Sequence, residues 1–198
     1  MEFQQNTNVY TSDGKGVGSL SRVVIETETD QVTYIVIKTG LLIKDDKVIP
    51  ITNIASADQE KVTLNCTGED IKEMSPLNVE VPVTGDVSSQ GRAYDPLTGG
   101  AVPAPAVVTE TRRTIPEELV ALKEGAHVIT ENEKHVGSLD CVITEPETVK
   151  VTEFIVSQGL LSKTRKSIPI EWVKVLGEEE IHLTVEDREF DALRPNQG

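Results

Sequence analysis

The side chains that could carry chemistry are few, and they do not gather at the spacings that catalysis or metal binding requires. The chain has three histidines and two cysteines, namely His127, His135, His182, Cys66 and Cys141. Neither cysteine belongs to a CxxC pair, no serine or cysteine has an evident triad context, and no glycine-rich phosphate loop is present. The sequence therefore predicts no catalytic residue, no cofactor site, no metal site and no enzymatic activity.

Three charged clusters are candidates for ion-binding sites. Asp45 and Asp46 could begin a cation site, but a hard cation needs several more oxygen ligands. We interpret this pair, and the acidic run 178–180, as solvated turns. The cluster Lys163, Arg165 and Lys166 is the best candidate for an anion site, and we interpret it as a solvated loop.

The overall charge restricts the class of partner. Lys and Arg number 19 against 33 Asp and Glu, which gives a net charge of −14. Phosphate binding needs clustered basic residues, so this balance argues against strong nucleic-acid binding. The first ten residues lack the pattern of a signal peptide, and no apolar run approaches the ~20 residues of a membrane span. We therefore expect a cytoplasmic protein with reduced cysteines and no transmembrane segment.

An internal repeat organises the chain. The motif V-G-S-L occurs at Val17–Leu20 and at Val136–Leu139, and 136 − 17 = 119. With this shift, residues 9–76 align with residues 128–195 without a gap, and about a third of the aligned positions are identical. The chain thus contains two copies of one small domain. None of the three histidines is shared between the copies, because their counterparts are Asn, Gly and Thr.

Comparing the copies predicts which face of each strand is buried. Residues 33, 35 and 37 keep one face apolar in both copies, as Thr-Ile-Ile and Thr-Phe-Val, whereas Tyr34 is replaced by Glu153. A period of two with one conserved apolar face is typical of a half-buried strand. The same comparison assigns four isoleucines to the core, Ile49, Ile51, Ile168 and Ile170, and leaves Val48 outside because it becomes Ser167.

Short strands and a closing helical turn predict the fold class. Asp13-Gly14 marks a hairpin, and last strands end at Leu64 and Leu183. Each copy then ends in a helical turn, capped in the first copy by Thr67 with Asp70. Many short strands in ~65 residues indicate a small closed barrel, since closure removes the sheet edges. We expect a mainly all-β protein with two small barrels in tandem, each closed by a short helical turn.

The segment between the copies is rich in Gly, Pro, Ser and Ala and predicts a partly disordered linker. Its flanks, V-E-V-P-V and A-V-V-T-E-T-R-R, could add strands to a barrel edge. The stretch T-I-P-E-E-L-V-A-L-K-E-G is typical of a short helix that begins at Thr114 and ends at Gly125. The expected domains are residues 1–76, a linker at 77–114, and residues 115–198 with this short leading helix.

The motif order resembles a known family. V-G-x-L, a hydrophobic strand, G-L-L, a charged hairpin and I-P-I, followed by Ile54 or by Trp172-Val173, are similar to the PRC-barrel domain. That family includes the cytoplasmic domain of the photosynthetic reaction-centre H subunit and the C-terminal domain of the ribosome maturation factor. The resemblance covers both repeats and implies a tandem PRC-barrel protein that acts as a non-enzymatic adaptor in the assembly of complexes.

The repeat motifs supply the candidate residues for partner binding. Gly-Leu-Leu occurs in both copies, and its leucines either fill the barrel or form an apolar patch for a partner or for the sister barrel. These partner-binding candidates are Leu41, Leu42, Leu160 and Leu161. The structural positions of the motifs are Gly18, Gly40, Pro50, Gly137, Gly159 and Pro169, of which the prolines mark a strand edge, end or bulge.

Three functions remain open at the level of the sequence. The first is an adaptor that binds another protein, with internal pairing of the barrels or a homodimer. The second is an RNA-processing or ribosome-assembly factor that works mainly through protein contacts. The third is a small-ligand binder with a pocket between the barrels.

Overall fold

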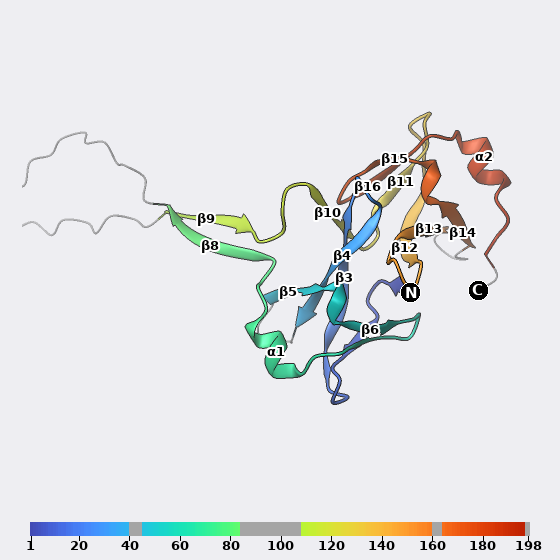
Figure 1. Ribbon diagram of the computed structural model, residues 1–198. Helices are drawn as coiled ribbons and strands as arrows, with labels where there is room; N and C mark the ends of the chain where they lie inside the picture. Colours follow the sequence, from blue (N-terminus) through green and yellow to red (C-terminus); the bar gives the residue numbers. More distant parts are fainter. Residues whose placement is uncertain (40–44, 84–107, 160–163, 197–198) are drawn as a thin grey trace, which may run out of the picture.

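The structure is a computed structural model that describes residues 1–39, 45–83, 108–159 and 164–196. It is mainly β, with two short α-helices, and contains two seven-stranded sheets and one two-stranded sheet (Figure 1). The partner-binding candidates Leu41, Leu42, Leu160 and Leu161, and the structural position Gly40, lie outside the described residues.

The first large sheet has the strand order β5-β4-β3-β2-β7-β6, with β10 also paired to β3. Its strands are β2 (Asn8–Tyr10), β3 (Gly16–Glu26), β4 (Gln31–Thr39), β5 (Asp45–Pro50), β6 (Ile54–Ala57), β7 (Lys61–Leu64) and β10 (Leu119–Lys123). A 3-10 turn, η1 (Ile51–Asn53), follows β5, and the helix α1 (Gly68–Glu73) follows β7.

The second large sheet repeats this order as β14-β13-β12-β11-β16-β15, with β1 also paired to β12. Its strands are β1 (Glu2–Gln4), β11 (His127–Ile129), β12 (His135–Thr144), β13 (Val151–Gln158), β14 (Thr164–Pro169), β15 (Val173–Leu176) and β16 (Glu180–Leu183). The turn η2 (Ile170–Trp172) and the helix α2 (Asp187–Ala192) complete the series. The two halves of the chain thus share one element order and one strand order.

Neither sheet closes into a barrel. In the part of the chain that the structure describes, no ladder joins β5 to β6 or β14 to β15, so both sheets keep two open ends. The sequence predicted closed barrels because closure removes edges. In each half, a strand from the other half instead pairs with the part of the long inner strand, β3 or β12, that β2 or β11 leaves free.

This strand exchange is reciprocal. The strand β1 precedes β2 in the chain but pairs with β12 of the second sheet, whereas β10 precedes β11 but pairs with β3 of the first. Phe3 lies opposite Val142, and Leu122 lies opposite Val23, which are the same pairing at equivalent repeat positions. The chain therefore crosses between the sheets twice, at residues 5–7 and 124–126.

A pseudo-two-fold axis relates the halves. The Val32 amide donates to the Val149 carbonyl at 3.1 Å, and the Val151 amide donates to the Asp30 carbonyl at 2.8 Å. The 119-residue shift relates the donors Val32 and Val151 to each other, and likewise the acceptors Asp30 and Val149, so the two hydrogen bonds are equivalent. Between them Gln31 forms a bridge with Lys150, its own repeat counterpart. A position that meets its own equivalent lies at the axis.

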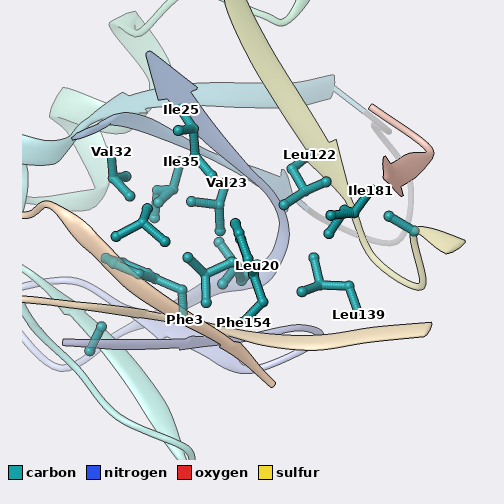
Figure 2. Close-up of a cluster of buried hydrophobic side chains, with 14 of the residues drawn as sticks. Phe3, Leu20, Val23, Ile25, Val32, Ile35, Leu122, Leu139, Phe154 and Ile181 are labelled. Carbon is teal, nitrogen blue, oxygen red and sulfur yellow. The ribbon is translucent and has the colours of Figure 1, made fainter. Parts of the chain in front are cut away.

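The core is shared by both halves. One cluster contains Phe3, Leu20 and Ile35 together with Leu122 and Phe154, and each of these side chains is at most 1% exposed (Figure 2). The predicted core strands are thus confirmed, including the burial of Ile49 and Ile168. Ile51 and Ile170 are only partly buried, because they lie in the 3-10 turns at the margin of this cluster.

A second apolar cluster covers the opposite face of the first sheet. Val24, Val36 and Val48 pack there against Leu77 and Ile115. The prediction that Val48 lies outside the core was wrong, since its side chain is 9% exposed. The chain around residues 77 and 115 lies over this face, which comparison of the two copies alone does not reveal.

The middle of the chain departs from the prediction in two places. The strands β8 (Asn78–Val83) and β9 (Val108–Arg113) pair with each other and project from the body, rather than adding to a barrel edge (Figure 1). The predicted helix over residues 114–125 is absent. Its residues 119–123 form β10, because the edge of β3 offers backbone partners and Leu122 enters the shared core. The predicted linker residues 84–107 lie outside the described residues.

Several local predictions are confirmed. Thr67 caps α1, with its amide donating to Asp70 Oδ2 at 2.8 Å, and Glu186 and Glu189 form the matching capping box of α2. Pro50 and Pro169 end β5 and β14, immediately before the 3-10 turns.

The glycine of V-G-S-L is required by close backbone approach. Gly18 has φ 152°, and a Cβ at this position would lie 1.9 Å from the Lys38 carbonyl oxygen. At the equivalent Gly137, a Cβ would lie 2.7 Å from the Ser157 carbonyl oxygen. The motif is repeated because the first large strand of each half crosses its neighbour at a distance that only glycine permits.

Gly18→Ala should lower the free energy of unfolding by about 2 kcal/mol or more, because the added methyl group collides with backbone that cannot move cheaply. Gly68→Ala is the matched control, since a Cβ there meets nothing within 4 Å. It should change stability by less than about 1 kcal/mol. Denaturant melts of both variants test this, and equal effects would contradict the close approach.

Cutting the chain after Gly99 should leave two fragments that stay together and remain folded. Each fragment carries one strand of the other's sheet, and the core spans both. Fragment 1–99 alone lacks β10 and should fail to fold as a monomer. Size-exclusion chromatography and circular dichroism check both expectations. Two independently folded monomeric fragments would contradict the shared core.

Candidate interaction surface

The predicted basic cluster is used inside the protein. Lys166 is 6% exposed, and its Nζ donates to the carbonyls of Phe190 at 3.1 Å and Asp191 at 3.2 Å. Arg165 forms an ion pair with Asp140, at 2.7 Å between Nη2 and Oδ2. The interpretation of a solvated loop was therefore wrong for Lys166, which satisfies the carbonyls at the end of α2. Lys163 lies outside the described residues.

The acidic run 178–180 was interpreted as a solvated turn, which holds for the exposed Glu179 and Glu180 but was wrong for Glu178. Glu178 Oε2 lies 2.9 Å from Arg113 Nη2 and 3.4 Å from Arg22 Nη1, and Glu179 pairs with Lys123. Burial and the charge of Arg113 lower the pKa of Arg22. These contacts tie β3, β9 and β10 to the turn between β15 and β16, so they fix the two halves relative to each other.

A pocket of about 640 Å³ lies beside the pseudo-two-fold axis. Its lining comes from the β3–β4 hairpin, the end of β5 with η1, the segment that leads into β10, and Val149 of the second half. Tyr34 and Leu119 contribute to this lining and also pack against the second apolar cluster. Packing against this cluster therefore holds the apolar part of the pocket lining in place.

Carboxylates accompany this apolar lining. Glu26, Glu28 and Glu118 line the pocket, and no Lys or Arg among the described residues lines it. Glu26 is held by the Thr29 hydroxyl, which donates to its Oε2 at 2.6 Å. The pocket thus combines apolar contact area with negative charge. This arrangement suits a ligand that carries an aliphatic or aromatic group next to a cation.

Sequence reasoning missed this pocket, because its residues come from four separate segments. One signal pointed to it. Tyr34 and Val48 are apolar where the second copy has Glu153 and Ser167, although all four were assigned to the outer face. Such differences indicate that another segment of the chain covers this face of the sheet in the first copy but not in the second.

Among the described residues, the structural glycines Gly18, Gly137 and Gly159 and the two thiols do not line the pocket. Gly159 directly follows β13 with φ 96°, next to the undescribed residues 160–163. Both cysteines are free. Burial raises the pKa of Cys141 to about 12 and also raises the pKa of the half-buried Cys66. Among the described residues, no group of three or more His, Cys, Asp or Glu side chains is arranged to hold a metal ion.

Comparison with protein families identifies one domain. Residues 5–71 match the PRC-barrel domain, a span that runs from the first crossing between the sheets into α1. Domains of this family often mediate protein interactions. No curated protein matches the chain significantly. In the described part of the chain, no helix is long and apolar enough to cross a membrane.

Alkylation of the native protein should label Cys66 and leave Cys141 largely unmodified. Raising the pKa from 9.0 to about 12 reduces the reactive thiolate of Cys141 roughly a thousandfold near neutral pH. Iodoacetamide labelling followed by peptide mass spectrometry measures this. Unfolding in urea should make both rates equal, and equal rates in the native protein would contradict the burial of Cys141.

Proposed function

We propose that this chain is a non-enzymatic adaptor, built from two PRC-type domains in tandem, that binds an extended basic segment of a partner protein. The observation that carries the proposal is the acidic pocket with apolar lining beside the pseudo-two-fold axis. It extends the general role in protein interaction indicated by the domain at residues 5–71.

The tandem arrangement is supported by the repeat and by the matching strand order of the two sheets. The second copy carries counterparts of every strand and helix in the matched region. A shared core and the ion pairs of Glu178 hold the copies in one body. A binding site between segments of both copies then has fixed geometry.

The chemistry of the partner follows from the pocket. Three glutamates around Tyr34 and Leu119 favour Lys or Arg side chains that alternate with aliphatic ones. A net charge of −14 strengthens this preference at long range. Phosphate groups are disfavoured by the same charges, and Arg165 and Lys166 are engaged internally. The RNA-processing alternative therefore has no observation in its favour.

A small organic cation is the second candidate ligand. The pocket volume of about 640 Å³ falls within the roughly 300–1,000 Å³ of small-molecule sites. The same pocket residues would bind the small cation and the basic peptide segment. A binding experiment with each of the two ligands is therefore needed to distinguish them.

Amide NMR spectra during titration with defined octapeptides test the proposal. A peptide of alternating Leu and Arg should shift the signals of Tyr34 and Leu119, whereas a peptide of alternating Leu and Glu should not. The double variant Glu26→Lys/Glu118→Lys should weaken binding at least about tenfold, because it reverses two of the three pocket charges. Arginine amide serves as the small-cation probe.

Glu60→Lys is the matched control, since Glu60 is exposed in the turn between β6 and β7, away from the pocket lining. It changes the net charge by half as much as the double variant and should leave affinity within about twofold. Equal binding of the acidic peptide, or shifts confined to another surface, would overturn the proposal. Tight binding of arginine amide without peptide binding would favour the small-ligand function.

A further inference from the structure

All three histidines of the chain lie in neighbouring strands of the second sheet. His127 belongs to β11, His135 to β12 and His182 to β16. In the strand registers, Ile129 lies opposite His135 on one side and opposite His182 on the other. Side chains opposite each other in a ladder share a face, so His135 and His182 lie on the same face as Ile129. His127 lies two residues before Ile129 in β11 and therefore belongs to this face as well.

Two of these imidazoles converge. His127 Nδ1 lies 2.9 Å from His135 Nε2, and both residues are exposed. The ring centroids are 4.7 Å apart with an interplanar angle of 75°. A straight N–H···N hydrogen bond of this length would place the ring centres about 5.2 Å apart. The shorter separation means that the rings meet at an angle and not along one straight N–H···N line.

This geometry matches two cis ligands of one metal ion. Imidazole nitrogens bind zinc at about 2.0–2.1 Å, and two such bonds at 90–109° separate the nitrogens by about 2.9–3.4 Å. The observed 2.9 Å lies at the lower end of that range. Imidazole is a suitable ligand for zinc, copper and nickel ions.

The surrounding charge favours a cation. Glu180 lies opposite His127 in the parallel pairing of β11 with β16, and its Oε2 is 3.2 Å from His182 Nε2. The Glu180 carboxylate is half-exposed, at 54%, so it can rotate toward the imidazole pair. Glu180 is therefore the candidate for a third, oxygen ligand.

We propose that His127 and His135 form a surface site for a late first-row divalent metal ion, with Glu180 as the third ligand and water at the remaining positions. In the described structure no group of three or more side chains is already arranged around an ion. The site is thus an exchangeable one, built on two fixed imidazoles. This proposal is independent of the acidic pocket, which lies among other residues.

Metal titration of the tag-free protein with Cys66→Ser tests the site, since this change removes the more accessible thiol. Ni²⁺ should broaden the imidazole NMR signals of His127 and His135 first, and Zn²⁺ should raise the melting temperature, because the ion binds the folded strands preferentially. His127→Asn and His135→Asn should each lower the affinity for Zn²⁺ at least about tenfold.

His182→Asn is the matched control and should change the affinity less than about threefold, because His182 is not a proposed ligand. Glu180→Gln should give an intermediate loss. Unchanged Zn²⁺ affinity in His135→Asn, or Ni²⁺ broadening centred on another surface, would overturn the proposal. So would the absence of any saturable binding at millimolar metal. Both ligand residues are exposed, so the variants should remain folded, and their circular dichroism spectra verify this.

Discussion

The structure depends on the fact that one copy of the repeat cannot bury its apolar surface alone. Each copy has about 65 residues, and the whole chain is only 4% aromatic, so its core must be assembled from Val, Ile and Leu. The exchange of β1 and β10 solves this problem in both halves at once. Phe3 and Leu122 enter the shared core from strands that belong to the other half in sequence. The same strands supply backbone partners for the parts of β3 and β12 that β2 and β11 leave free.

This exchange also creates the acidic pocket. The chain must run from β9 to β10 across the first sheet, and on the way it places Pro116, Glu118 and Leu119 along one side of the pocket. Ile115 on the same segment closes the second apolar cluster, on which Tyr34 rests. The pocket is therefore a consequence of the crossing rather than a feature of either copy, which explains why it contains residues from both.

The sequence predicted what local rules and the repeat determine. The strand faces at Ile35 and Phe154, the Thr67 cap and the prolines that end β5 and β14 follow from periodicity and backbone chemistry. It did not predict partners that are distant in the chain. Residues 119–123 have helical spacing of Leu119 and Leu122, yet they form a strand because the edge of β3 is available. The buried Lys166 and the paired Glu178 were misjudged for the same reason, since their partners lie in other elements.

Joining two copies in one chain also allows them to diverge, which a symmetric homodimer does not. At one repeat position the first copy has Arg22, held by Glu178, and the second has the buried thiol of Cys141. At another the first copy has Tyr34 beside the acidic pocket and the second has Glu153. The paired imidazoles occur only in the second copy, where the first has Asn8 and Gly16. The shared core fixes the positions that must stay equivalent, and the exposed faces are free to acquire different chemistry on each side of the pseudo-two-fold axis.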